Sequence, residues 1–134
     1  MNDRMKIIAI FVSLAAIVLI SGCHKSSPTA SINPEVTNEL GNFSFLLPDV
    51  LDASATLSYT WINTEALAEI GHMSNPINGT AIVRIKDGVG NEVYVSDLLE
   101  SGTEQSKIGT PGNWTITVTL DKFDGTAQFT VHSI

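Results

Sequence analysis

The chain has 134 residues, of which 7 are basic and 14 are acidic, so its formal net charge at pH 7 is −7. No basic stripe is present, which argues against nucleic-acid binding and against electrostatic adsorption to anionic lipid. The single cysteine, Cys23, cannot form an internal disulfide.

Residues 1–22 have the pattern of a signal peptide. Arg4 and Lys6 precede an uncharged apolar run over residues 7–20. A helix that crosses the hydrocarbon core of a membrane needs about 20 residues, and this run is shorter. We therefore favour a cleaved signal peptide over the alternative, an uncleaved anchor helix that ends at Cys23. Under either hypothesis the rest of the chain lies outside the cytoplasm.

The sequence ISGC over residues 20–23 resembles the lipobox of bacterial lipoproteins. The resemblance implies cleavage before Cys23, a diacylglyceryl group on its sulfur and usually an acyl group on its new amino terminus. Two or more acyl chains anchor a protein stably to a membrane. In a host with two membranes the resemblance implies anchoring in the outer membrane. In some such bacteria an aspartate just after the cysteine marks retention in the inner membrane, and here those positions hold His24 and Lys25.

Residues 23–40 are expected to form a tether between the lipid and a folded domain. They are rich in Ser, Thr and Pro and begin with few large apolar side chains, so they contribute little to a core. A flexible coil of this kind spans roughly 20 Å. The folded domain is then predicted over residues 41–134, a length at which one small domain can fold alone.

Alternating apolar residues predict strands in the first half of this domain. Residues 42–47 form a short strand around Phe43 and Phe45, and residues 55–63 place Leu57, Tyr59 and Trp61 on one face. Residues 65–73 contain good helix formers, so a short helix stays open there. We favour a strand, because Gly71 and the flanking asparagines limit a helix to about two turns.

A hairpin is predicted over residues 80–98. The first strand places Ala81, Val83 and Ile85 inward, and the sequence DGVGN provides the turn. On the returning strand, strict alternation places Val93 and Val95 inward and leaves Tyr94 facing solvent.

The clearest alternation lies over residues 114–120, WTITVTL, where the apolar residues share one face and the threonines share the other. Asp124 and Gly125 tolerate positive φ and predict a turn, after which residues 127–133 alternate again as the second strand of a C-terminal hairpin. The phases of these segments predict a shared core that contains Trp61, Trp114, Ile116, Val118, Phe129 and Val131.

Six or seven short strands separated by Gly, Asn, Pro and Ser predict an all-β fold, an antiparallel two-sheet sandwich. The positions of Gly109, Gly112, Trp114 and Gly125 resemble the small immunoglobulin-like or jelly-roll domains of bacterial envelope proteins. This resemblance supports the fold rather than an activity, because such domains host many functions.

No catalytic motif stands out. G-x-S-x-G is absent, and the three histidines lie outside recognisable motifs: His24 in the tether, His72 before a Met-Ser-Asn-Pro loop and His132 on an outward strand face. We therefore expect a protein that is not an enzyme and needs no cofactor.

Two kinds of ligand site are weak candidates. Asp87, Asp121 and Asp124 lie in predicted turns and could bind calcium, but Val89 occupies the third position of an EF-hand pattern, and Asp is an ordinary turn residue. The predicted exposure of Tyr94 makes it the one aromatic residue that could stack on a sugar, because Trp61 and Trp114 alternate in phase with core residues.

The sequence therefore favours a non-catalytic, lipid-anchored envelope protein that binds or supports another envelope component. The alternative is a small module that binds glycan or calcium through Tyr94 or the aspartate-bearing turns. The expected partners are the membrane, through Cys23, and an envelope protein or glycan.

Overall fold

The computed structural model describes residues 32–134 and contains seven β-strands and no helix within them. The strands are β1 (Glu35–Glu39), β2 (Asn42–Asn63), β3 (Ala68–His72), β4 (Asn75–Lys86), β5 (Glu92–Asp97), β6 (Gly102–Gln105) and β7 (Gly112–Ser133). The predicted signal peptide and the predicted lipidation at Cys23 lie outside the described residues. Nothing over residues 32–134 forms a helix long and apolar enough to cross a membrane.

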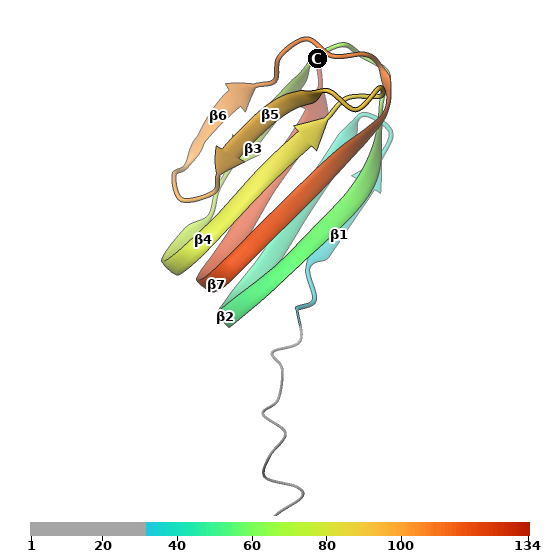
Figure 1. Ribbon diagram of the computed structural model, residues 1–134. Coiled ribbons are helices and arrows are strands. Elements are labelled where there is room, and N and C mark those ends of the chain that lie inside the picture. The colour runs from blue at the N-terminus through green and yellow to red at the C-terminus, as the bar shows by residue number, and fades with distance from the viewer. Residues whose placement is uncertain (1–31) are drawn as a thin grey trace, which may run out of the picture.

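Two long strands build both layers of the molecule. β2 and β7 have 22 residues each and pair antiparallel along their whole length, and the ladder bends over near its middle (Figure 1). The first layer contains β1, the first half of β2, the second half of β7, β3 and β6. The second layer contains the second half of β2, the first half of β7, β4 and β5. The predicted antiparallel two-sheet sandwich is confirmed.

The bend is made by residues in unusual backbone conformations. Asp49, Asp52 and Lys122 have φ angles of 30°, 50° and 46°, and Gly79 and Gly125 on the neighbouring strands also have positive φ. The β2–β7 register shifts three times in this region, as expected where β-bulges bend a ladder.

This bend corrects the predicted C-terminal hairpin. Gly125 has a positive φ, as predicted, and Asp124 precedes it. The chain nevertheless does not reverse there and continues as one strand into the other sheet. The reason is that a bulge and a tight turn need the same residue types, so the local sequence does not distinguish them.

Strand β1 corrects the expected extent of the tether. The predicted tether includes residues 35–39, but these residues pair with β2 from Glu35 opposite Leu46 to Glu39 opposite Asn42. Every residue of β1 is exposed, so its sequence carries no alternating apolar signal. Backbone hydrogen bonds hold this strand at the sheet edge.

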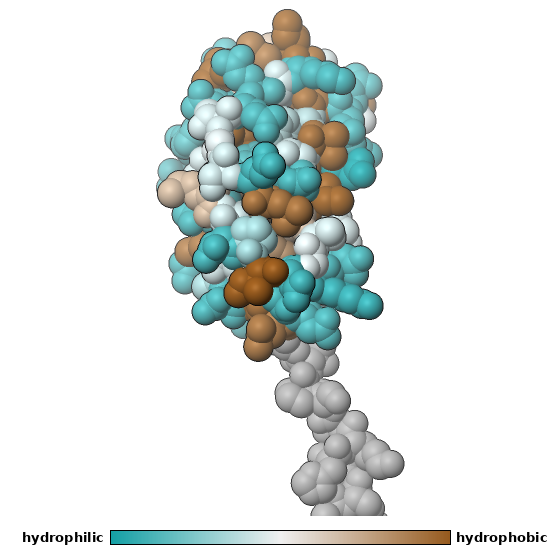
Figure 2. All heavy atoms as spheres, turned by 90° about the vertical axis from the view of Figure 1, so that its left-hand side faces the viewer, coloured by the Kyte–Doolittle hydropathy of each residue, from teal (hydrophilic) through white to brown (hydrophobic). Residues whose placement is uncertain are grey.

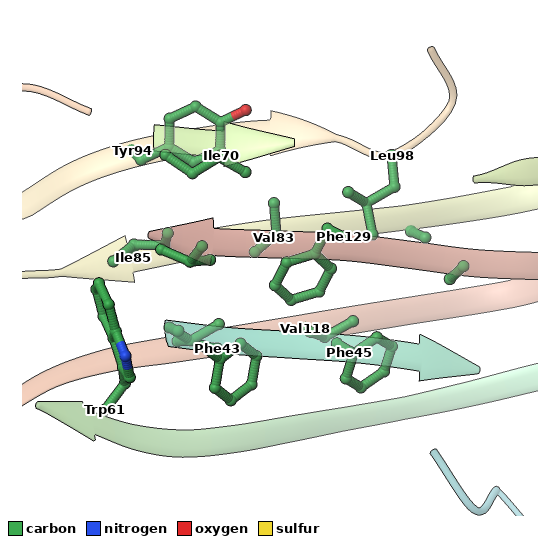
Figure 3. Packing of buried hydrophobic residues seen from close by; sticks show 14 of the residues in the cluster. Phe43, Phe45, Trp61, Ile70, Val83, Ile85, Tyr94, Leu98, Val118 and Phe129 are labelled. Carbon is green, nitrogen blue, oxygen red and sulfur yellow. The ribbon is translucent and has the colours of Figure 1, made fainter. Parts of the chain in front are cut away.

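The core lies between the two layers and contains the residues predicted for it. Trp61 and Trp114 are fully buried and meet edge to face, with ring centroids 5.9 Å apart. Their indole nitrogens donate to the carbonyl oxygens of Glu39 and Thr110, at 3.1 and 2.8 Å. Phe129 is stacked against Phe43 and Phe45, and Figure 3 shows aromatic and branched side chains gathered between the strands.

Residues 65–73 contain β3 and no helix. Ala68, Ile70 and His72 are buried in alternation, and β3 pairs with β7 on one side and β6 on the other. The preference for a strand in this segment is therefore confirmed.

Candidate functional site

The sandwich is open on the side where β5 and β6 lie. These strands are the outer edges of different layers, and no strand pairing joins them within residues 32–134. One backbone hydrogen bond bridges the two edges, because the N–H of Lys107, which follows β6, donates to the carbonyl oxygen of Val93 at 2.8 Å. A hollow of about 190 Å³ lies between them, on the side of the molecule that faces the viewer in Figure 2. Its lining residues are Glu92, Val93, Tyr94, Val95, Glu104, Gln105 and Lys107.

A β-bulge determines which side chains of β5 enter this hollow. Lys86 faces Glu92 and Ile85 faces Tyr94, so Val93 is an extra residue in the ladder. Tyr94 is consequently only 7% exposed, whereas Val95 is 48% exposed. The predictions that Tyr94 faces solvent and Val95 faces inward are both wrong, because the bulge reverses the alternation after Val93.

The Tyr94 hydroxyl contacts a buried histidine on the opposite layer. Its oxygen lies 2.5 Å from Nε2 of His72, which ends β3, so this contact joins the two layers on their open side. Burial is the largest effect on the pKa of Tyr94 and raises it; a hydrogen bond with Ser96 lowers this pKa, and the weaker effects of the Glu104 and Asp97 carboxylates raise it. The phenol is therefore protonated at neutral pH and can donate a hydrogen bond to Nε2 in the His72 tautomer that carries its proton on Nδ1.

His72 also lines a second, smaller hollow of about 80 Å³, together with Ser96, Asp97, Glu100, Ser101, Gly102 and Glu104. Glu104 borders both hollows. We call the two hollows together the β5–β6 groove. Four carboxylates and one ammonium group line it, so the groove is anionic. One of these carboxylates, Glu92, is paired with Arg84 at 3.1 Å.

The groove combines groups suited to binding a polar, uncharged ligand. Carboxylates accept hydrogen bonds, the Gln105 amide both donates and accepts, and Lys107 donates. Tyr94 and Val95 add apolar surface to the larger hollow.

Asp87 has a structural role in the β4–β5 turn. Its Oδ1 accepts hydrogen bonds from the backbone N–H groups of Val89 and Asn91, and its Oδ2 accepts one from Thr110 at 2.9 Å. These hydrogen bonds, that from Thr110 foremost, lower the pKa of Asp87. The carboxylate therefore ties the turn to the loop that precedes β7.

Asp121 and Asp124 lie at the bend, far from Asp87. Thr80 of β4 faces Asp121, and Asp87 follows the last residue of the same strand, so about 20 Å of extended chain separates the two sites. Asp124 Oδ1 accepts a hydrogen bond from the Asp52 backbone at 2.6 Å. The three aspartates do not converge on one calcium ion. No group of three His, Cys, Asp or Glu side chains in the described part of the chain is arranged to hold a metal.

The inward position of His72 is not among the predictions from the sequence, although the sequence contains a signal for it. His72 is in phase with Ala68 and Ile70, and continuing that alternation places it on the buried face. Glu104 and Gln105 gave no such signal, because all four residues of β6 are exposed. Only the spatial arrangement of the two sheet edges brings these side chains beside Tyr94.

The sequence matches no protein-family model and no curated protein. Among solved structures it is similar to the carbohydrate-binding module TmCBM61 in complex with β-1,4-galactotriose, with TM-score 0.43 and 20% identity over 67% of this chain and 68% of that one. It is also similar to the capsular polysaccharide assembling protein CapF of Staphylococcus aureus, with TM-score 0.38 and 12% identity over 84% of this chain and 30% of that one.

A third similarity is to the cupin domain of Cnp3 from Schizosaccharomyces pombe, with TM-score 0.35 and 10% identity over 81% of this chain and 68% of that one. These distant similarities assign neither a ligand nor an activity to this chain.

Proposed function

We propose that this protein is a non-catalytic, lipid-anchored binding domain that takes one sugar unit of a glycan in the β5–β6 groove. The observation that carries this proposal is the hollow between the edges of the two layers, at β5 and β6. Its volume of about 190 Å³ is below the 300–1,000 Å³ typical of pockets that enclose a drug-sized ligand. The hollow therefore suits a single small unit of a longer chain.

The lining supports a neutral glycan over an acidic one. The hydroxyl groups of a sugar can donate hydrogen bonds to Glu104 and can both donate to and accept from the Gln105 amide. The apolar surface of Val95 can pack against the C–H face of the sugar ring. The surplus of carboxylates disfavours phosphorylated or acidic sugars, since like charges repel at short range.

The membrane anchor in this proposal is Cys23, which rests on the lipobox resemblance of residues 20–23. Lipid on this residue would place the groove outside the cytoplasm, and in a host with two membranes the anchor membrane would be the outer one. An envelope glycan would then be within reach of the groove. The proposal therefore combines the two hypotheses from the sequence, an envelope protein that binds another component and a small module that binds glycan.

Thermal unfolding in the presence of neutral and acidic oligosaccharides, and with calcium or EDTA, tests the proposal. A ligand that binds only the folded state stabilises it by about 2.7 kcal/mol at 100 times its Kd, which raises the midpoint. We expect a shift with one or more neutral glycans and none with acidic glycans. Isothermal titration with the most stabilising glycan then gives its Kd.

Variants at the groove make the test specific. Glu104→Ala and Gln105→Ala should each weaken binding at least several-fold, because each removes a polar partner of the ligand. The matched control is Glu35→Ala, which removes an exposed carboxylate from β1 and should leave the Kd unchanged. A panel without any shift would contradict glycan binding, and a shift that survives both groove variants would place the site elsewhere.

A further inference from the structure

Two of the most exposed apolar side chains in residues 32–134 lie at the bend. Leu51 is 72% exposed and Ile77 is 71% exposed. Their chain neighbours Val50 and Pro76 face Gly125 from opposite sides, so Leu51 and Ile77 flank β7 at the same end of the sandwich. Figure 2 shows hydrophobic atoms at the lower end of the molecule.

The described chain begins at this same end. Glu35 pairs with Leu46, and the residues before it run toward the bend, where Ile32 packs against the core (Figure 1). Residues 24–31 join Ile32 to Cys23. A coil of that length spans roughly 14–17 Å, so a lipid on Cys23 would hold the bend close to the headgroups.

We propose that the bend end rests on the lipid surface in which Cys23 is anchored, with Leu51 and Ile77 entering the headgroup region. The bend end comprises these two residues with Asp49, Asp52, Asp121, Lys122 and Asp124. The proposal rests on the lipid anchor of the proposed function and is independent of glycan binding. Two apolar side chains suffice for contact here because a short tether gives them a high effective concentration at the bilayer.

The opposite end of the sandwich is a poorer partner for the same bilayer. It also exposes apolar residues, foremost Ile108, which is 78% exposed and precedes the start of β7 at Gly112. The first half of β7 separates that end from the bend by about 27 Å, whereas residues 24–31 reach at most about 30 Å when fully extended. Contact through Ile108 would therefore require the tether to run almost straight along the domain.

Charge determines which lipids the bend end accepts. Its four aspartates outnumber Lys122, so an anionic bilayer repels it while a zwitterionic bilayer does not. Salt screens this repulsion, with a Debye length of about 10 Å at 0.1 M. Contact should thus be strongest on phosphatidylcholine, weaker when phosphatidylglycerol is added at low salt, and restored by salt.

The test is a depth measurement on the full lipidated protein in vesicles. A cysteine is introduced by Leu51→Cys, Ile77→Cys or, as the matched control, Ile108→Cys, and is labelled with an environment-sensitive dye. Because Cys23 is the only native cysteine, lipid on its sulfur leaves a single reactive thiol in each variant. Phosphatidylcholine carrying a headgroup nitroxide serves as the quencher.

We expect a blue shift and strong quenching at positions 51 and 77 and little of either at position 108. Equal, weak quenching at all three positions would show that the domain moves freely on its tether, and stronger quenching at 108 would show the reverse orientation. Either result overturns the proposal. Labelling of two thiols per chain would instead show an unmodified Cys23, so failure of the anchor is distinguishable from failure of the contact.

Discussion

The bend of the β2–β7 ladder predicts that replacing Gly125 with alanine strongly destabilises the domain. Gly125 has a φ of +124°, a conformation that side chains rarely adopt, and a Cβ atom there would lie 2.4 Å from the carbonyl oxygen of Asn75. That oxygen belongs to the backbone, so the clash is relieved only by moving β4 away from β7.

The magnitude follows from two contributions. A non-glycine residue held in a sparsely populated φ/ψ region costs about 1–3 kcal/mol, and relieving the overlap of the new Cβ atom with the Asn75 carbonyl oxygen adds about 1–3 kcal/mol, as overpacking does. Their sum of roughly 2–6 kcal/mol is a large part of the 5–15 kcal/mol that stabilises a typical domain. Gly125→Ala should therefore lower the urea midpoint far more than an ordinary surface substitution does.

Two other glycines separate these contributions. Gly90 also has positive φ, at +92°, but a Cβ atom there meets nothing within 4 Å. Gly102 has neither a positive φ nor a neighbour within 4 Å. Equilibrium urea unfolding, followed by tryptophan fluorescence, should give a small change for Gly102→Ala, an intermediate loss for Gly90→Ala and the largest loss for Gly125→Ala. If Gly125→Ala were no worse than Gly90→Ala, the close approach of β4 and β7 at the bend would be refuted.

Three further predictions concern single side chains. Tyr94→Phe leaves Nε2 of buried His72 without its hydroxyl partner and should cost about 1–3 kcal/mol in urea unfolding; an unchanged midpoint would argue against this contact. Trp114→Ala removes a fully buried indole and should cost about 3–5 kcal/mol, so a loss under about 0.5 kcal/mol would place Trp114 outside the core. The pKa of Asp87 is lower in the folded state than its ordinary 3.8, so its contribution is present at neutral pH and is lost as the pH falls below that value. Asp87→Asn should therefore destabilise at pH 7 and make the midpoint depend less on pH in the acid range, and an unchanged acid dependence would contradict this role.

Much of the core could be predicted because burial in this fold follows period two. The side chains of Ile116, Val118, Phe129 and Val131 all point inward, as their alternation indicates. Each of these segments lies in a strand with one buried face, so the local pattern records the environment directly. The same reasoning identified β3 despite its good helix formers, since Gly71 and the neighbouring strands limited a helix.

The features that the sequence did not reveal depend on pairing between distant strands. The bulge arises because β5 has one more residue than the facing part of β4. The sequence of β5 alone therefore does not indicate that Val93 is the extra residue. The bend at Gly125 has the composition of a tight turn, and exposed β1 has no inward face to produce a pattern. The β5–β6 groove is formed by the edges of two layers, which is a property of their packing.

The position of β7 at the centre of both layers also determines when the domain can form. β7 pairs with β2, β3 and β4, and its contacts with β2 join residues such as Phe43 and Val131 that are far apart in the chain. Until residues 112–133 are available, only the β1–β2, β3–β6 and β4–β5 pairings can form, and isolated two-stranded pairings are marginally stable. Folding must therefore wait for the last strand and close loops of high contact order, which makes it slow. A chain that stays unfolded until its final strand has been synthesised could pass through a membrane translocation channel in extended form, as the export predicted from its N-terminal sequence would require.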